Sequence, residues 1–106
     1  MSAPFVQQLR TGRAPVTIAG SGVPLAFRVE ASDIWDAVRV SAPASATVVQ
    51  LKRAVVDALF PGEQVGDFVL KLRGWEMLDE NEALEHAGIG NGSIVLIAYR
   101  RRRPVR

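Results

Sequence analysis

The segment that decides the fold runs from residue 68 to residue 99 and reads FVLKLRGWEMLDENEALEHAGIGNGSIVLIAY. Its first part alternates with a period of two, as a half-buried strand does: Phe68, Leu70 and Leu72 against Val69, Lys71 and Arg73. Gly74 marks a turn, after which we expect a short strand from Met77 that runs into a polar loop. Residues 82–87 predict a single helical turn, and residues 93–99, rich in β-branched side chains, predict a last strand.

A helix is predicted upstream of this segment, over about residues 47–60. Thr47 and Gln50 have the spacing of a capping box, in which each side chain satisfies a backbone N–H at the start of the helix. Apolar residues then recur along one stripe, at Val48, Leu51, Val55 and Leu59. Pro61 and Gly62 are typical of the end of a helix. Lys52 is expected on another face of the helix than the apolar stripe.

Further upstream, the pattern predicts an antiparallel hairpin. Leu25, Phe27 and Val29 alternate with polar or small residues, and Val38 and Val40 flank Arg39 in the same way. The loop between these strands carries Ile34 and Trp35, which is unusual for a turn.

The chain therefore divides into three parts. Residues 1–22 contain no acidic residue and are interrupted by glycine and proline, so we expect a flexible N-terminal arm, with a brief strand over residues 16–18 as the alternative. Residues 23–100 form the folded domain, of α+β class, with strands on either side of one helix. Residues 101–106 form an arginine-rich C-terminal tail.

Composition excludes several classes of function. The chain has 106 residues, 48% of them hydrophobic, which fits one globular domain. It has no cysteine and one histidine, so neither a thiolate or histidine metal site nor a catalytic triad is expected. The longest apolar run, residues 94–99, is far shorter than the ~20 residues of a membrane span. We therefore expect a cytoplasmic protein with no catalytic residues, no metal and no cofactor.

The ordered set of elements resembles ubiquitin and the β-grasp ubiquitin-like family over residues 25–100. The resemblance rests on the helix start at residues 43–52, where the family has a partly buried lysine that corresponds to Lys52, and on the strand and turn at residues 70–74. It also rests on Leu78, Leu84, Ile89 and the run from Gly92 to Leu96. The resemblance implies a ubiquitin-like roll in which a mixed sheet of four to five strands packs on one helix.

Departures from the family pattern bear on function. Conjugated members end in an exposed Gly-Gly, whereas this sequence contains no Gly-Gly and continues into an arginine run, so the resemblance implies a protein that is not conjugated. The central isoleucine of the family's recognition surface corresponds to Lys71, and a second aliphatic residue to Ala98. The lysine that follows the turn glycine in ubiquitin corresponds to Trp75.

A bacterial origin is favoured by the arginine-rich composition, because 11 of the 13 basic residues are arginine. Residues 84–92 resemble a segment of ubiquitin-like proteins from type VII secretion loci. Together these features suggest a non-conjugating adaptor or small subunit of a larger assembly, with a protein partner that has an acidic surface. The sequence indicates no oligomeric state.

The candidate protein-binding residues are Trp75, Lys71, Leu96, Ala98 and Trp35. Tryptophans are enriched in the energetic centres of interfaces, and both of these fall in predicted turns. The alternative interpretation is that each indole folds back as a lid on the edge of the sheet.

The candidate electrostatic tail comprises Arg100, Arg101, Arg102, Arg103 and Arg106. Without it, the remaining chain has 8 basic and 11 acidic residues. The tail is compatible with an acidic protein, with nucleic acid, with an anionic membrane, or with no ligand at all. A nucleic-acid-binding accessory protein is thus the alternative function, although no aromatic residue among the arginines offers base stacking.

Three weaker candidates have ordinary explanations. His86 lacks neighbouring ligands for a metal and is expected to be a solvated loop residue. The glycine-rich run at residues 88–92 precedes a strand instead of a helix, so it predicts a turn and not a phosphate site. The carboxylates are expected to form a solvated acidic patch: Asp79, Glu80, Glu82 and Glu85.

Overall fold

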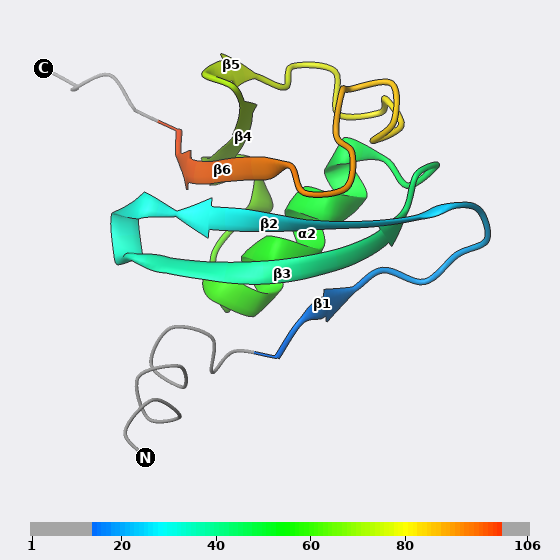
Figure 1. Ribbon diagram of the computed structural model, residues 1–106. Coiled ribbons are helices and arrows are strands. Elements are labelled where there is room, and N and C mark those ends of the chain that lie inside the picture. Colours follow the sequence, from blue (N-terminus) through cyan, green and yellow to red (C-terminus); the bar gives the residue numbers. More distant parts are fainter. Residues whose placement is uncertain (1–13, 101–106) are drawn as a thin grey trace, which may run out of the picture.

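The computed structural model describes residues 14–100, which form one six-stranded mixed sheet and one α-helix. The strands are β1 (Val16–Thr17), β2 (Pro24–Ala31), β3 (Asp36–Pro43), β4 (Phe68–Leu72), β5 (Trp75–Glu76) and β6 (Ile94–Tyr99). Two short 3-10 turns, η1 (Ser32–Ile34) and η2 (Val65–Asp67), precede β3 and β4. The helix, α2 (Val48–Leu59), packs behind the sheet (Figure 1).

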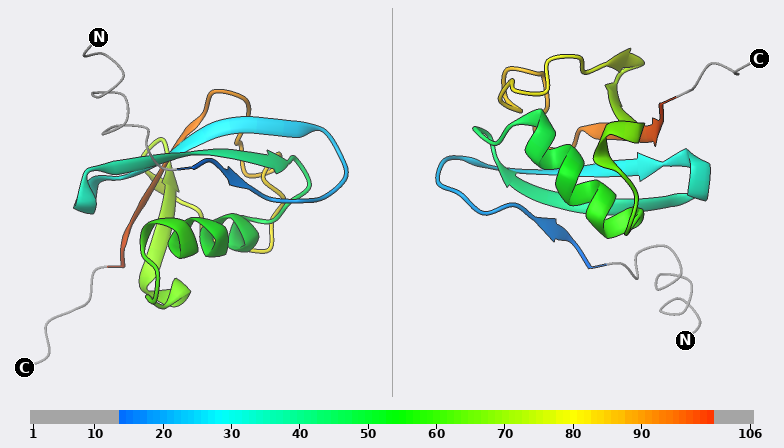
Figure 2. Two further views of the ribbon diagram at one scale, coloured as in Figure 1. Left: turned by 90° about the horizontal axis from the view of Figure 1, so that it is seen from below. Right: turned by 180° about the vertical axis from the view of Figure 1, so that it is seen from behind.

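The sheet has the strand order β1-β3-β2-β6-β4-β5. β2 is antiparallel to β3 and parallel to β6, and β6 is antiparallel to β4. Alternate residues of β2, β3, β4 and β6 point toward α2, which confirms the inward set predicted for β2, β3 and β4. The left view of Figure 2 shows the result as two layers, with the sheet on one side and α2 on the other.

The capping box predicted at the start of α2 is present. The Thr47 hydroxyl accepts a hydrogen bond from Gln50 N at 3.2 Å, and the Gln50 amide oxygen accepts one from Thr47 N at 2.8 Å. Two more N–H groups of the first turn donate to the distant loop before β6: Val48 to Glu82 O and Val49 to Glu80 O. Because a helix leaves its first four N–H groups without an internal partner, this loop completes the cap.

The turn after β4 differs from its prediction. Arg73 and Gly74, with φ of 54° and 85°, form a two-residue hairpin turn, so the return strand starts at Trp75 and not at Met77. Met77 packs against the core, whereas Leu78 is 80% exposed. The core position after the turn, which we expected at Leu78, is therefore occupied by Met77.

The N-terminal arm is shorter than predicted, in the part that the structure describes. Val16 and Thr17 pair with Val40 and Ser41 in parallel, and Val16 and Ile18 pack against the core. The brief strand, which we had considered as the alternative, thus lies at residues 16–17 because two apolar side chains gain burial there. Residues 1–13 lie outside the described part, as do residues 101–106 of the tail.

Lys52, which the spacing placed off the apolar stripe of α2 and the resemblance implied to be partly buried, is only 2% exposed. Its Nζ donates a hydrogen bond of 3.0 Å to Phe68 O and forms an ion pair with the Glu80 carboxylate. The aliphatic part of the Lys52 side chain is buried between α2 and β4, and the Glu80 carboxylate compensates the charge of its ammonium group.

In residues 14–100, no helix combines the length and the hydropathy that crossing a membrane requires.

Candidate protein-docking surface

One face of the sheet packs on α2, and the opposite face has no covering layer among the described residues (Figures 1 and 2). Alternation along β6 places Ile94, Leu96 and Ala98 on this uncovered side, and alternation along β4 adds Val69 and Lys71. We call these five residues, together with Arg28 and Glu30 of β2, the outer face.

Strand register makes the outer-face residues direct neighbours. Lys71 lies opposite Leu96, and Leu96 lies opposite Glu30, which gives one row across three strands. A second row pairs Arg28 with Ile94, and a third pairs Val69 with Ala98. The three predicted residues Lys71, Leu96 and Ala98 are therefore brought together, although 25 residues separate Lys71 from Leu96 in sequence.

The apolar part of the outer face is only partly exposed. Ile94 and Leu96 are 47% and 37% exposed, and Val69 is buried although it lies outside the core cluster. The uncovered side of the sheet thus has a strip of aliphatic groups from β4 and β6. Such a strip is the usual centre of a protein interface, with polar residues around it.

The charged residues on and next to the outer face are unevenly paired. Glu30 is bound to Arg28 at 3.0 Å, and the nearby Glu76 of β5 is bound to Arg100 at 3.6 Å. Within residues 14–100, no carboxylate lies at ion-pair distance from Lys71. The acidic groups are therefore already compensated, while Lys71 remains available at the centre.

Comparison with known proteins agrees with this topology. No protein-family model and no curated protein matches the sequence. Three solved structures that match are the C-terminal ubiquitin-like domain of mouse tubulin-specific chaperone e, a ubiquitin from Caldiarchaeum subterraneum and a ubiquitin-like domain of an Arabidopsis thaliana protein. Their TM-scores are 0.65, 0.65 and 0.63, at identities of 20%, 16% and 17%. The aligned parts cover 82%, 76% and 84% of this chain and 97%, 98% and 89% of those chains, respectively.

The chain has a ubiquitin-like β-grasp fold. This confirms the α+β class and the roll around one helix, with six strands where four to five were expected.

Within the ubiquitin-like fold, Trp75 does not share the outer face with Lys71. Trp75 lies opposite Leu72, a core residue, whereas Lys71 lies opposite Glu76. Because directly opposed residues project from the same side of a sheet, the indole of Trp75 starts on the other side of β5. Trp75 is nevertheless 79% exposed, because β5 is the edge strand of the sheet that residues 14–100 form.

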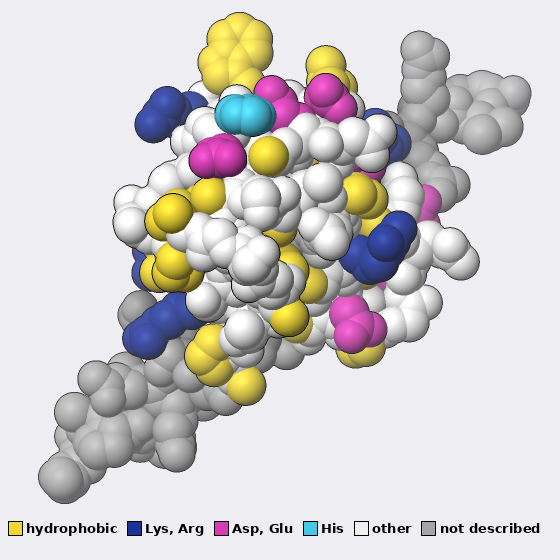
Figure 3. Space-filling view, turned by 90° about the vertical axis from the view of Figure 1, so that its right-hand side faces the viewer, with side chains coloured by type: hydrophobic (Ala, Val, Ile, Leu, Met, Phe, Trp, Pro, Cys, Tyr) yellow, Lys and Arg dark blue, Asp and Glu magenta, His cyan; other side chains and the backbone are white. Residues whose placement is uncertain are grey.

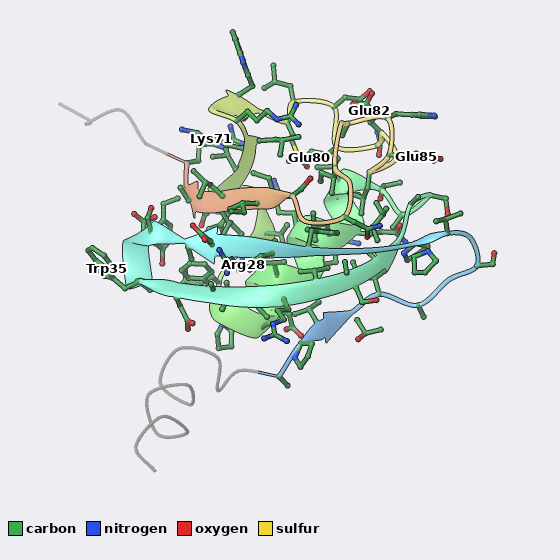
Figure 4. All side chains as sticks on the ribbon, in the orientation of Figure 1. Arg28, Trp35, Lys71, Glu80, Glu82 and Glu85 are labelled. Atoms are coloured by element: carbon green, nitrogen blue, oxygen red, sulfur yellow. The ribbon has the colours of Figure 1, made fainter. Side chains whose placement is uncertain are left out.

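Trp35 occupies the tip of the β2–β3 hairpin. It is 95% exposed and has a left-handed backbone, with φ of 53° and ψ of 44°. Figure 4 shows it projecting from one end of the hairpin, away from Lys71 and at the opposite end from Glu82 and Glu85. Neither tryptophan forms a lid on the sheet, so both indoles are exposed. Trp35, Trp75 and the outer face are, however, three separate places on the surface.

The only arginine of the predicted electrostatic tail that lies in the described part is Arg100. Its backbone N donates to Asp67 O at 2.6 Å, its Nε to Gly66 O at 3.4 Å, and its guanidinium contacts Glu76. Arg100 therefore anchors the end of β6 to the start of β4 and to β5. Arg101, Arg102, Arg103 and Arg106 lie outside the described residues.

The four acidic candidates do not act as one patch. Glu80 neutralises buried Lys52, and an Asp79 oxygen accepts a hydrogen bond from Asn81 N at 3.1 Å. Glu82 is half-buried and Glu85 is exposed, and Figure 4 shows both on the loop between β5 and β6. Figure 3 shows carboxylates beside the single histidine at the upper end of that face. In the described part of the chain, no group of three or more potential ligands could hold a metal ion.

Tyr99 closes the end of the core next to the outer face. Its ring contacts Phe60 and Phe68, with centroids 5.5 and 4.6 Å apart. Partial burial raises the pKa of the Tyr99 phenol, and the carboxylates of Glu63, Asp33 and Asp67 add to the increase. The phenol thus remains neutral at the end of β6.

Sequence reasoning missed four outer-face residues: Ile94, Val69, Arg28 and Glu30. Ile94 was detectable, since it shares the alternation of Leu96 and Ala98 on one strand. Arg28 was not, because its place beside Ile94 depends on the parallel pairing of β2 with β6, across 65 intervening residues.

Proposed function

We propose that this chain is a non-enzymatic protein-interaction module, an adaptor or small subunit of a larger assembly, and that a partner docks on its outer face. The observation that carries the proposal is the uncovered aliphatic strip of Ile94, Leu96 and Ala98 beside Lys71, on a sheet whose other face is fully packed.

The size of the strip predicts a weak or transient complex. Burying the remaining exposed area of Ile94 and of Leu96 contributes about 1 kcal/mol each, given ~1.5–3 kcal/mol for a whole aliphatic side chain. Two such contributions do not reach micromolar affinity, which corresponds to about 8 kcal/mol. The partner must therefore gain further affinity from Lys71, from one of the exposed tryptophans, or from both.

The finer part of the proposal concerns origin and setting. A bacterial assembly, similar in style to those encoded at type VII secretion loci, is supported by the 11 arginines among 13 basic residues and by the segment from Leu84 to Gly92. An acidic partner surface is supported by Lys71, which the outer face leaves without a counter-ion in the described residues.

The experiment is affinity capture from the native host with three forms of the full chain. Leu96→Asp places a charge in the centre of the strip, and Val23→Asp is the matched control, because Val23 is a 69% exposed aliphatic residue in the loop before β2. We expect the unsubstituted chain and Val23→Asp to capture the same protein, and Leu96→Asp to lose it by at least tenfold.

Two results would refute the proposal. One is equal capture by Leu96→Asp and Val23→Asp, which would mean that the partner binds elsewhere. The other is recovery of nucleic acid alone, lost on nuclease treatment or at high salt, which would favour the nucleic-acid-binding alternative.

A further inference from the structure

Two arginines lie directly opposite each other on the side of the sheet that faces away from α2. They are Arg28 of β2 and Arg39 of β3, which are register partners in the hairpin. The residues before and after each arginine are buried: Phe27, Val29, Val38 and Val40. Alternation therefore turns both arginine side chains outward, and both are exposed. Arg39 extends the second row of the outer face, which then runs from Arg39 through Arg28 to Ile94.

The two arginines occupy the closer of the two kinds of register position in an antiparallel pair. Arg28 N donates to Ser93 O at 3.0 Å, on the side of β6, so Arg28 and Arg39 do not exchange backbone hydrogen bonds. The Cα atoms of such a pair are only about 4.5 Å apart, and the side chains start close together. Because like charges at directly opposed positions destabilise a sheet, an anion bound between the two guanidinium groups would relieve their repulsion.

The arginine pair is not neutralised within the chain. Of the carboxylates in residues 14–100, only Glu30 forms an ion pair with it, at 3.0 Å from Arg28, and Arg39 has no counter-ion in that range. Two guanidinium charges and one carboxylate leave a net charge of +1. The side chains of Arg28 and Glu30 are 51% and 37% exposed, and an ion pair that is so exposed to water contributes little. An external anion of higher charge can therefore take the place of Glu30 on Arg28.

The chemistry of the pair favours a phosphoryl group over a carboxylate. A guanidinium donates two parallel hydrogen bonds to two oxygens of either anion. A carboxylate has only two oxygens, whereas a phosphate monoester has three terminal oxygens and a charge of about −1.5 to −2 at neutral pH. One phosphoryl group can thus accept from both arginines and offset both charges. The hydroxyl of Ser41, two residues after Arg39 and on the same side of β3, offers a further donor.

We propose that Arg28 and Arg39 bind a phosphorylated serine or threonine of the partner protein that docks on the outer face. This inference rests on the proposed function and adds a ligand chemistry to it. The phosphoryl group bridges the two guanidinium groups and displaces Glu30. An aliphatic side chain of the same partner segment packs on Ile94, the neighbour of Arg28 on β6.

A phosphorylated protein fits this site better than a nucleic acid does. None of the outward-facing residues of β2, β3, β4 and β6 is aromatic, so no base can stack beside the arginines in the part of the sheet that the structure describes. Aliphatic groups lie there instead, at Ile94 and Leu96. The surface therefore offers a site for one phosphate next to apolar contacts, as a peptide requires.

The test measures fluorescence anisotropy of a labelled peptide, Gly-Ala-Leu-Ala-phosphoserine-Ala-Leu-Ala-Gly, on the full chain. The variants are Arg28→Met, Arg39→Met and, as the matched control, Arg53→Met, which removes an exposed arginine from α2 in the other layer. Hydrogen bonds to charged groups are strong enough to change a dissociation constant by about tenfold. We therefore expect about tenfold weaker binding to Arg28→Met and to Arg39→Met, and no change with Arg53→Met.

Glu30→Gln gives a result of the opposite sign. It removes the carboxylate that competes for Arg28, so the phosphopeptide should bind about threefold more tightly. The same peptide with serine should not bind, and the peptide with aspartate should bind at least tenfold more weakly than the phosphopeptide. Equal binding of the serine peptide and the phosphopeptide, no binding at millimolar phosphopeptide, or unchanged binding to Arg39→Met would overturn the proposal. Tighter binding of an oligothymidylate than of the phosphopeptide would favour a nucleic acid and would also overturn it.

A second measurement does not depend on the folding of any variant. Saturating phosphopeptide should raise the melting temperature of the unsubstituted chain, because it binds the folded state, and the serine peptide should not. An equal effect of the two peptides would contradict the site.

Treatment of the host lysate with a phosphatase separates this inference from the proposed function. We expect the treatment, and likewise Arg39→Met, to abolish capture of the partner that Leu96→Asp also loses. If capture survives both but is lost with Leu96→Asp, the proposed function stands and the phosphate site is refuted. If capture survives Leu96→Asp as well, both are refuted.

Discussion

Trp35→Asn should stabilise the protein, although it removes a large apolar side chain. Trp35 has a left-handed backbone and is 95% exposed, so its indole makes almost no contact in the folded chain. A non-glycine residue in this conformation costs about 1–2 kcal/mol, and asparagine tolerates it better than other residues because its short side chain bonds locally. We therefore expect the free energy of unfolding to rise by about 1 kcal/mol.

Urea denaturation followed by far-UV circular dichroism measures the effect. A gain of 1 kcal/mol corresponds to a rise of roughly 0.5–1 M in the midpoint for a typical small domain, and to about 4–8 °C in the melting temperature. Trp75→Asn is the matched control, since Trp75 is also highly exposed but has no positive φ. It should change stability by less than about 0.5 kcal/mol.

A loss of stability in Trp35→Asn, or an equal gain in both variants, would refute the reasoning. The first result would mean that the indole packs on the protein in solution. The second would mean that removing any exposed indole has the same effect and that the backbone conformation at Trp35 contributes nothing. If the predicted gain is found, the wild-type residue lowers the stability of the free chain, as expected for a side chain retained for binding.

Three further predictions concern the core and its margins. Glu80→Ala should lower the free energy of unfolding by about 2 kcal/mol, because it leaves the Lys52 ammonium without a counter-ion, and adding Lys52→Met should recover part of the loss in urea denaturation. No recovery would mean that the ion pair is not the cause. The single tyrosine, Tyr99, should titrate above its unfolded pKa of about 10 in absorbance at 295 nm, and return to that value in urea. Since the folded pKa is raised, stability should fall as the pH rises past 10, and an unshifted titration would contradict the local geometry. Gly88→Ala should destabilise by about 1 kcal/mol or more, because φ is 96° and a Cβ would lie 3.3 Å from Leu72 Cδ2; an unchanged melting temperature would contradict this.

Much of the fold was accessible from the sequence because its signals are local. Alternation in Phe27 and Val29, and the capping pair Thr47 and Gln50, depend on neighbours within four residues. The errors occurred where a non-local contact decided the outcome. The spacing placed Lys52 off the apolar stripe of α2, and only the contact with Glu80, 28 residues away, explains how its charge is compensated on full burial.

The candidate docking surface shows the same division. The resemblance identified Lys71 and Ala98, because they correspond to residues of the family's recognition surface, and Leu96 lies two residues before Ala98 on the same strand. Sequence reasoning grouped Trp75 with them, which the two-residue turn after β4 prevents by placing Trp75 opposite Leu72. One residue more or less in that turn would have reversed the side from which the indole projects.

The sequence by itself determined most of the apolar side chains that are buried, because period and capping encode burial one element at a time. Only the tertiary structure decided which exposed side chains are neighbours, as in the row from Glu30 through Leu96 to Lys71. It also decided that residues 16–17 join the edge of β3. The physical reason is that strand order and register are set by the packing of the whole sheet on α2, to which every element contributes and which no single segment encodes.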